Sequence, residues 1–287
     1  AAEDIMVKEF RFAKHETLRN ERLSIMREFS VTQLPILDDM GKVVDLELSE
    51  PLSKFSVRHN NIFIMAGGKG TRMGDLTANC PKPMLSVFGK PILQGILEAC
   101  KSCGFYKFTI SVNYLKEIIQ DYFRDGSKFD VSIDYVVEDE PLGTCGSLSL
   151  LDDKGPEPIV VVNGDLFTSV NFASLVDFHE SHNADLTMCV KKKNINLEYA
   201  VVEVKGSNFE GLVEKPSYDF LINAGIYVLG PKAIGLIPRA EEFNMTDLIE
   251  LGKRNGLSVK IFFVHEDWVD IGNPDVINSA DQWSTNC

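Results

Sequence analysis

Glycines and cations gather in one short stretch of the chain. Residues 65–74 read MAGGKGTRMG and follow the apolar run Ile62-Phe63-Ile64. Glycine has no Cβ atom, so a glycine-rich turn after a strand lets the backbone come close to a ligand with its N–H groups exposed. Lys69 and Arg72 lie in the same stretch, and Lys82 follows ten residues after Arg72. This combination suits phosphate groups, although the glycines alone are equally typical of an ordinary turn between a strand and a helix.

Two aspartates follow predicted strands elsewhere in the chain. Asp165 comes just after the β-branched run 159–162, which is typical of a strand buried on both faces. A carboxylate at such a strand end points into the crevice where a ligand is expected. Asp270 follows a second predicted strand and lies in Trp268-Val-Asp-Ile-Gly272. A turn aspartate at 165 and a helix cap at 270 are the alternatives that the residues alone leave open.

Residues 65–85, MAGGKGTRMGDLTANCPKPML, resemble the signature of sugar-1-phosphate nucleotidylyltransferases, roughly LAGGxGTRLxPLTxxxPKPML. The chain resembles mannose-1-phosphate guanylyltransferases within this family, and mannose, a heptose, glucose and an amino sugar all remain open as the sugar. One departure is Gly74-Asp75, where the family often has a residue pair ending in proline. The resemblance implies transfer of a nucleoside monophosphate from a nucleoside triphosphate to a sugar 1-phosphate, with release of pyrophosphate. Its two partners are therefore small polyanions.

The resemblance also assigns roles to residues. Arg72 would hold the β and γ phosphates, and Lys82 would bridge the α phosphate and the sugar phosphate. Asp165 and Asp270 would bind Mg²⁺, which proteins usually hold through one or two carboxylates plus substrate phosphates. Arg72, Lys82 and Asp165 are thus the expected catalytic residues. The expected nucleotide-binding residues are Ala66, Gly67, Gly68, Gly70, Thr71, Arg72, Glu138 and Gly143.

Sugar contacts are expected from the Glu-Lys-Pro and Asn-Ala-Gly segments of the second half and from the loop Pro141-Leu-Gly-Thr144. The residues are Gly143, Glu214, Lys215 and Asn223. Without the resemblance, a solvated pair of charges is the plainer interpretation of Glu214 and Lys215. Glu138 favours GTP, because an ionised carboxylate only accepts hydrogen bonds and guanine offers two adjacent donors.

Charge and composition limit the other kinds of partner and location that the protein could have. Against 29 Lys and Arg stand 42 Asp and Glu, a net charge of −13, so we expect no binding to nucleic acid or to an anionic membrane surface. The sequence contains no apolar run of about 18 residues, so no membrane span is predicted. The six cysteines form no zinc pattern and indicate a reducing compartment, so we expect a cytoplasmic protein.

Residues 1–50 are predicted to form a separate small unit, with the order strand, helix, strand, strand and a helix capped by Thr17. The unit resembles a single cystathionine-β-synthase (CBS) repeat in Asp4-Ile-Met6, Met26-Arg-Glu28 and 34–44. Such repeats generally work in pairs, so either this chain is a fragment that has lost a first repeat or this repeat pairs with a copy from another subunit. A homo-oligomer is expected, with this repeat as one candidate for the contact. Ser49-Glu-Pro-Leu52 has Leu where the family's ribose-binding Asp would stand, which makes ligand binding there doubtful.

Residues 51–60 are expected to be a linker, and 61–287 the nucleotidyltransferase domain. Alternating strands and helices from residue 61 predict a doubly wound, mostly parallel α/β sheet of Rossmann-like type. Consecutive strands over 199–204, 209–213 and 222–229 predict an antiparallel extension beside the cleft. Asn244 is expected to cap a helix through Arg254, and a last helix is expected over 274–283.

Two other functions remain open. One is a catalytically silent regulatory subunit that senses a nucleotide or a sugar nucleotide, although Arg72, Lys82, Asp165 and Asp270 are all retained. The other is a cytidylyltransferase acting on an alditol or choline phosphate, which the Glu-Lys-Pro and Asn-Ala-Gly segments disfavour. The identity of the sugar is not indicated.

Overall fold

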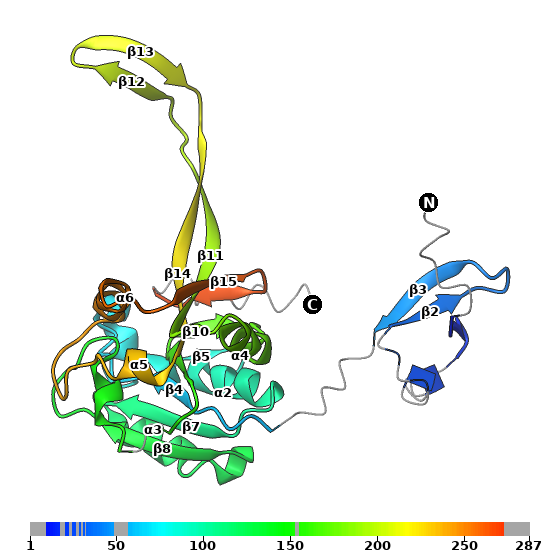
Figure 1. Cartoon of the computed structure of the whole chain (residues 1–287), viewed down its shortest axis with the longest axis horizontal. Helices are drawn as coiled ribbons and strands as arrows, with labels where there is room; N and C mark the ends of the chain where they lie inside the picture. The colour runs from blue at the N-terminus through cyan, green and yellow to red at the C-terminus, as the bar shows by residue number, and fades with distance from the viewer. Residues whose placement is uncertain are drawn as a thin grey trace. The chain divides into compact units, whose positions relative to one another are not determined.

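A computed structural model gives the fold. It describes residues 10–17, 21, 22, 25, 26, 29, 31, 33–48, 57–152 and 155–272, with the side chain of Arg72 excepted. The chain divides into two compact units, residues 1–56 and residues 57–287 (Figure 1).

The first unit contains a three-stranded sheet. Strands β1 (Ala13–Lys14) and β2 (Gln33–Leu37) are parallel, and β3 (Val43–Leu48) pairs antiparallel with β2. Residues 21, 22, 25 and 26, between β1 and β2, are helical, in the expected order of elements. The buried apolar cluster of this unit consists of Ala13, Met26, Leu34 and Ile36. The start of the helix after Thr17, Asp4-Ile-Met6 and Ser49-Glu-Pro-Leu52 lie outside the described residues.

The second unit is built on a seven-stranded sheet. In spatial order its strands are β15 (Val259–Val264), β11 (Leu186–Asn196), β14 (Ser217–Leu229), β9 (Ile159–Asn163), β4 (Ile62–Met65), β7 (Lys107–Val112) and β8 (Ser132–Val137). β9, β4, β7 and β8 are parallel, as are β11 and β15, while β14 runs antiparallel to both of its neighbours. The predicted α/β fold with a mostly parallel sheet is confirmed.

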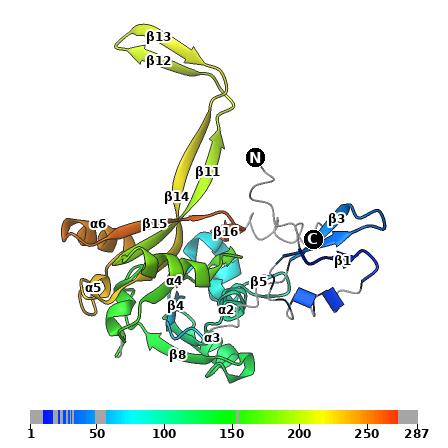
Figure 2. The same ribbon diagram turned by 45° about the vertical axis from the view of Figure 1, so that its right-hand side comes forward.

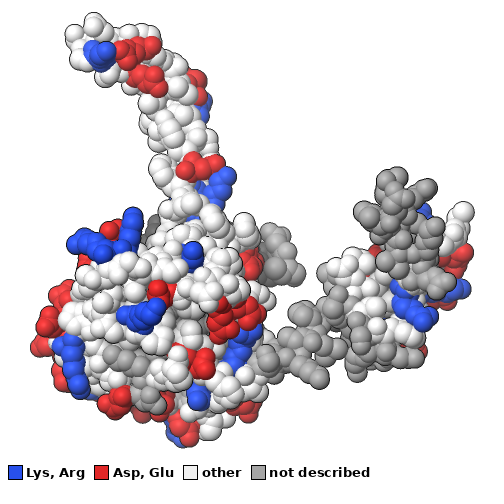
Figure 3. Space-filling model, viewed as in Figure 1, with Lys and Arg blue, Asp and Glu red and all other residues white. Residues whose placement is uncertain are grey.

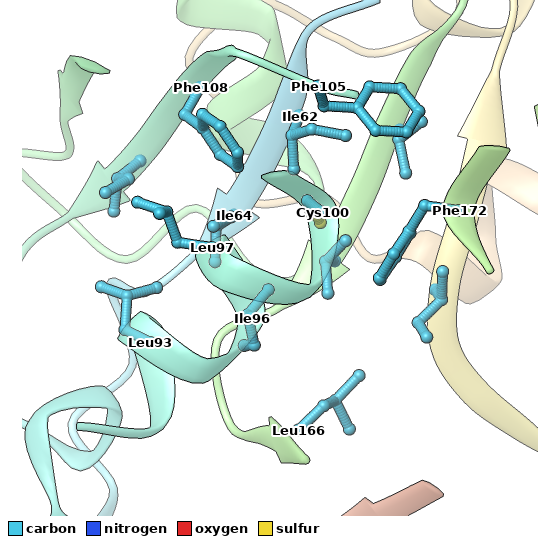
Figure 4. Close-up of a cluster of buried hydrophobic side chains, with 14 of the residues drawn as sticks. Ile62, Ile64, Leu93, Ile96, Leu97, Cys100, Phe105, Phe108, Leu166 and Phe172 are labelled. Carbon is cyan, nitrogen blue, oxygen red and sulfur yellow. The ribbon is translucent and has the colours of Figure 1, made fainter. Parts of the chain in front are cut away.

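Helices cover both faces of this sheet. On one face lie α2 (Ile92–Ser102), α3 (Lys116–Phe123) and α4 (Phe172–Ser181). Figure 4 shows how Leu93, Ile96 and Leu97 of α2 fill the space against Ile62 and Ile64 of β4. On the other face lie α5 (Pro231–Ile234) and α6 (Met245–Arg254), whose apolar residues pack on Phe63, Val161 and Tyr227. Burial on both faces explains why the central strands are almost continuously apolar.

Several short elements were not predicted. They are the 3-10 helices η2 (Thr71–Thr77), η3 (Lys82–Met84), η4 (Ser127–Phe129) and η5 (Gly146–Leu150) and the strands β5 (Ser86–Val87), β6 (Lys90–Pro91), β10 (Leu166–Thr168) and β16 (Trp268–Asp270). Elements of this length carry too few residues for a hydrophobic period to be visible. The helix predicted over 274–283 lies outside the described residues.

Strands β11 and β14 are longer than predicted and continue beyond the sheet. β15 pairs with β11 only as far as Lys191, and β9 pairs with β14 only from Ile226 onward, so farther out β11 and β14 pair with each other alone. The ribbon ends in the hairpin of β12 (Val201–Lys205) and β13 (Asn208–Val213). Figure 1 and Figure 2 show it projecting from the sheet. The expectation that it covers one side of the cleft is therefore wrong for the hairpin, since neither of its strands contributes to the cavity described below.

Candidate active site

A cavity of about 400 Å³ lies where the parallel strands β4, β7, β8 and β9 end. Open α/β sheets bind ligands at this edge, because the loops that leave neighbouring parallel strands meet there. Each of the four strands contributes through one of its last two residues or through the loop that follows. The lining residues are Met65, Ala66, Gly67, Gly68, Gly70, Thr71, Met73, Lys82, Pro83, Ser111, Glu138, Pro141, Leu142, Gly143, Thr144, Asn163, Gly164 and Asp165.

The loop after β4 depends on glycine at two positions for different reasons. Gly70 has φ of 62°, and a Cβ atom there would lie 3.1 Å from the Cβ atom of Lys82 and 3.1 Å from Cγ2 of Thr77. Gly67 has ordinary dihedrals, but a Cβ atom there would lie 2.8 Å from Oε1 of Glu138. The Thr77 hydroxyl donates to the Gly70 carbonyl at 3.0 Å and so holds the loop closed. Backbone and charged side chains therefore approach each other with little space to spare.

Lys82 and Asp165 form an ion pair in the wall of this cavity. Lys82 opens η3 between Pro81 and the buried Pro83, and its side chain is only 13% exposed. Asp165 leaves β9 beside Gly164, whose N–H donates to the Met65 carbonyl at 2.9 Å. A side chain at 164 would meet that carbonyl oxygen at 2.6 Å, so only glycine lets the β9 exit lie this close to the β4 exit. The Asp165 carboxylate is therefore held next to the glycine-rich loop after β4.

Asp270 lies on the strand that pairs with the segment after Asp165. In the antiparallel pair of β10 and β16, Leu166 lies opposite Asp270, and the Ile271 N–H donates to the Asp165 carbonyl at 3.0 Å. The Trp268 indole N–H donates to the Ala224 carbonyl at 2.8 Å and ties β16 to the Asn-Ala-Gly segment. The fold thus brings the backbones of the two aspartates together across about a hundred residues of sequence, although Asp270 is not among the cavity-lining residues.

Glu138 is a buried acid in the cavity wall, only 7% exposed. It accepts a hydrogen bond from the Leu142 N–H at 3.2 Å. Burial raises the pKa of its carboxyl group, and the hydrogen bond from the Leu142 N–H opposes that shift. A buried carboxylate held by a few donors has spare acceptor capacity toward the cavity.

The loop after Glu138 is fastened to the start of α6 in a way that the sequence did not indicate. Asn244 caps no N–H of its own helix; its Oδ1 atom accepts from the Thr144 N–H at 3.3 Å. The Thr144 hydroxyl in turn accepts from the Met245 N–H at 2.8 Å. The predicted cap by Asn244 is therefore wrong, because Thr144 supplies the capping oxygen and leaves Asn244 to bind the loop.

Four other predicted site residues either do not line the cavity or have side chains outside what the structure describes. The Arg72 side chain lies outside what the structure describes. Glu214 and Lys215 lie between β13 and β14, on the projecting ribbon, and do not line the cavity. Asn223 also lies outside the lining, but its segment borders it, since Gly225 packs against the cavity-lining Asn163.

Two polar lining residues were not expected. Ser111 is the penultimate residue of β7, and Asn163 is the last residue of β9. A single serine at a strand end carries no pattern, whereas Asn163 belongs to the Asn-Gly-Asp tripeptide in which only Asp165 was considered. The position of Asn163 one residue before Gly164 is the signal that could have pointed to it.

Comparisons with known proteins identify the family of the chain. The family described as "Nucleotidyl transferase" matches residues 62–285. The chain belongs to the nucleotidyl transferase family. A "Probable mannose-1-phosphate guanylyltransferase 1" of Oryza sativa subsp. japonica is 34% identical over 222 residues, covering 74% of this chain and 61% of that protein. The "UTP--glucose-1-phosphate uridylyltransferase" of Synechocystis is 32% identical, with 74% and 60% covered. The chain thus spans about three-fifths of the length of these curated relatives.

Solved structures share the nucleotidyl transferase fold. The crystal structure of HddC from Yersinia pseudotuberculosis complexed with GMP-PN has a TM-score of 0.60 and 24% identity, covering 78% of this chain and 99% of that one. A putative glucose-1-phosphate thymidylyltransferase from Bacillus anthracis has a TM-score of 0.63 and 21% identity, with 79% and 96% covered. At these identities the likeness concerns the fold. In the part of the chain that the structure describes, every helix is too short or too polar to cross a membrane.

Proposed function

We propose that this protein transfers GMP from GTP to a sugar 1-phosphate, with release of pyrophosphate, and that mannose 1-phosphate is the sugar phosphate to test first. The observation that carries the proposal is the ion pair of Lys82 and Asp165 in a glycine-walled cavity at the carboxyl ends of four parallel strands. Relatives named mannose-1-phosphate guanylyltransferases support both choices of substrate.

The reaction places demands on positioning rather than on activation of a nucleophile. The attacking oxygen of a sugar phosphate is already an anion, so the site must bring two polyanions together in line and stabilise charge on the transferred phosphoryl group. Lys82 supplies a compact, fixed cation in the cavity wall for the α phosphate and the sugar phosphate. The backbone of the loop 66–71 supplies N–H groups for the triphosphate, and Arg72 is assigned to its β and γ phosphates.

The donor set fits a divalent cation. Asp165 contributes carboxylate oxygens from the cavity wall, and Asp270 lies on the paired strand. Two carboxylates with substrate phosphates are the usual protein contribution to a magnesium site, so we assign Mg²⁺ to Asp165 and Asp270. Once bound there, the ion would supply charge neutralisation for the phosphates. The already fixed backbone at Gly164 would keep Asp165 aimed at it.

Glu138 is assigned to the base. Its carboxylate accepts hydrogen bonds only, and guanine presents an N1–H and an amino group side by side, whereas uracil and thymine present two carbonyls around one N–H. Gly67 leaves the carboxylate accessible from the loop side, since any larger side chain would lie against Oε1. GTP is therefore favoured over UTP and dTTP, although the relatives include a uridylyltransferase.

Sugar binding is assigned to Gly143, Asn223, Glu214 and Lys215. Gly143 lines the cavity and Asn223 lies in the segment that borders it. Glu214 and Lys215 lie on the ribbon, so their contact with the sugar requires the ribbon to approach the cavity when substrate is bound.

For residues 1–56 we propose a CBS-like unit with a packing role, and for the whole protein a homo-oligomer in the cytoplasm. The order of strands in this unit supports the first assignment.

A matrix of nucleoside triphosphates against sugar 1-phosphates, read out as pyrophosphate release, tests the proposal. Rapid release with GTP and mannose 1-phosphate is expected. Binding of GTP or a GDP-sugar without release for any pair would favour the regulatory subunit instead, and release with CTP and an alditol phosphate would favour the cytidylyltransferase.

A further inference from the structure

The projecting ribbon has an apolar face that no described part of its own chain covers. We call residues 191–222 the arm; it comprises the outer parts of β11 and β14 and the hairpin of β12 and β13. Residues directly opposite each other in an antiparallel pair share a face. Ile195 lies opposite Tyr218, and Phe220 is two residues farther along the same face. These three side chains are 42%, 41% and 49% exposed, and the rings of Tyr218 and Phe220 lie 6.4 Å apart.

The opposite face of the same ribbon is polar. Asp219 forms an ion pair with Lys192 at 2.8 Å and accepts from the Asn194 amide at 2.9 Å. Asn194 also donates to the Ser217 hydroxyl at 2.6 Å. Such a division into one polar and one apolar face is typical of a sheet that packs on another layer with one side only.

The hairpin at the end of the arm also carries an apolar face. Val202 lies opposite Leu212 and Val204 lies opposite Phe209, so one face of the hairpin carries four apolar side chains. They are 51%, 54%, 64% and 67% exposed in that order. A two-stranded hairpin with nothing against its apolar face is at best marginally stable in water.

The size of the uncovered surface fits a protein interface. With Leu197, which is 39% exposed, the arm presents eight such side chains, on the order of 800 Å² of apolar surface, which is what one partner contributes to an interface of standard size. Monomeric proteins rarely leave patches of this size in contact with water. Figure 3 shows that few charged groups lie along the middle of the arm in this view.

The charges at those two ends are opposite, which identifies the partner. The base of the arm carries Lys191, Lys192 and Lys193 against a single acid, Asp219, and residues 198–215 carry four glutamates against two lysines. When two copies of the arm lie side by side and antiparallel, the acidic outer end of each meets the lysine-bearing inner end of the other. In a dimer with two-fold symmetry, every such contact occurs twice. We propose that the arm pairs with the arm of a second copy of this chain through its apolar face, forming a homodimer.

Two neighbouring residues of β14 provide a matched test. Phe220 lies on the apolar face, and Leu221, 58% exposed, lies on the polar face. Light scattering on the full chain at micromolar concentration should give twice the 32.0 kDa chain mass. Phe209→Ser with Phe220→Ser should raise the dimer dissociation constant by roughly 100-fold or more, because apolar anchors dominate interface energies. Leu221→Ser should change it by less than about threefold. Circular dichroism confirms that each variant is folded.

A charge exchange separates pairing of arms from other causes. Lys192→Glu with Lys193→Glu, and separately Glu203→Lys with Glu210→Lys, should each weaken the dimer, while the four changes together should restore it. A monomeric unmodified chain would overturn the proposal. So would a dimer that survives Phe209→Ser with Phe220→Ser, since it would have to use another surface, such as residues 1–56.

Discussion

Lys82 and Asp165 are 83 residues apart in sequence and meet in the wall of one cavity. The backbone of each residue is fixed by its neighbours in sequence. Lys82 has a proline on either side, and Asp165 follows the glycine that lets the end of β9 lie close to the end of β4. A cation fixed in this way loses little freedom when phosphate binds. Preorganised charge of this kind is what phosphoryl transfer requires.

Lys82→Ala should lower turnover by about 10²- to 10⁴-fold, because a fixed cation at the transferring phosphate is lost. Lys69→Ala is the matched control, since Lys69 is an exposed lysine of the same loop that does not line the cavity. We expect that control to lose less than about tenfold. Pyrophosphate release measures both variants, and equal losses would remove the special role of Lys82.

Glu138→Gln should reduce the preference for GTP over UTP by about tenfold or more. The amide offers a donor where guanine needs acceptors, and a mismatched hydrogen bond in a buried site costs roughly 1–3 kcal/mol. The measurement is kcat/KM with each triphosphate at a fixed sugar 1-phosphate. An unchanged ratio would mean that the base is recognised elsewhere.

The same substitution should stabilise the fold at neutral pH. Burial raises the pKa of the Glu138 carboxyl, so at pH values between the unfolded and the native pKa the native protein keeps a proton that the unfolded chain has lost, and stability falls as pH rises from about 4.3 through the native pKa. Above the native pKa the buried carboxylate is ionised and the full penalty is present. Gln removes this penalty and still accepts from the Leu142 N–H. Glu138→Gln should therefore melt above the unmodified chain at pH 7, with the difference disappearing below about pH 4. A lower melting temperature at pH 7 would contradict this.

Among residues, those in one continuous motif could be predicted and those supplied by tertiary contacts could not. The glycines of the loop after β4, Lys82, Glu138 and Asp165 were expected from continuous motifs, and all of these except Gly74 line the cavity. Ser111 and Asn163 were missed because their role depends on which strand ends lie side by side. That information is in the order of strands, not in the neighbouring residues.

At the scale of elements, the loop after β4 should be destabilised by a substitution at Gly70 and should tolerate one at Gly68. Gly70→Ala forces a residue with a Cβ atom to φ of 62° and against Lys82 and Thr77, which should cost about 1–2 kcal/mol of unfolding free energy. Gly68→Ala meets nothing within 4 Å, so its cost should be below about 0.5 kcal/mol. Urea unfolding measures both, and equal costs would show that the loop is not held as described.

Long elements were predicted well because they repeat a hydrophobic period. α2 was expected over 91–103 and is observed over Ile92–Ser102; β7 was expected from Phe108 and begins at Lys107. The arm was the largest difference. Its strands were predicted, but a ribbon of alternating residues looks the same in sequence whether it lies over the cleft or projects from the sheet.

At the scale of the whole molecule, the two units should unfold separately. The buried apolar cluster described in the first unit consists of four residues, Ala13, Met26, Leu34 and Ile36, whereas the second unit has two large clusters. A small core stabilises weakly. A chain beginning at Val57 should therefore keep its melting temperature within a few degrees when measured by calorimetry. A large decrease would show that the second unit depends on the first.

The central claim is that the cavity joins a guanine triphosphate to a sugar phosphate. The most direct measurement is pyrophosphate release on mixing the protein with Mg²⁺, GTP and mannose 1-phosphate, with Lys82→Ala beside it. The account predicts release that needs both substrates and falls by at least about 10²-fold in the variant. Release that is absent with every triphosphate and sugar 1-phosphate, or that is equal in the two proteins, would contradict it.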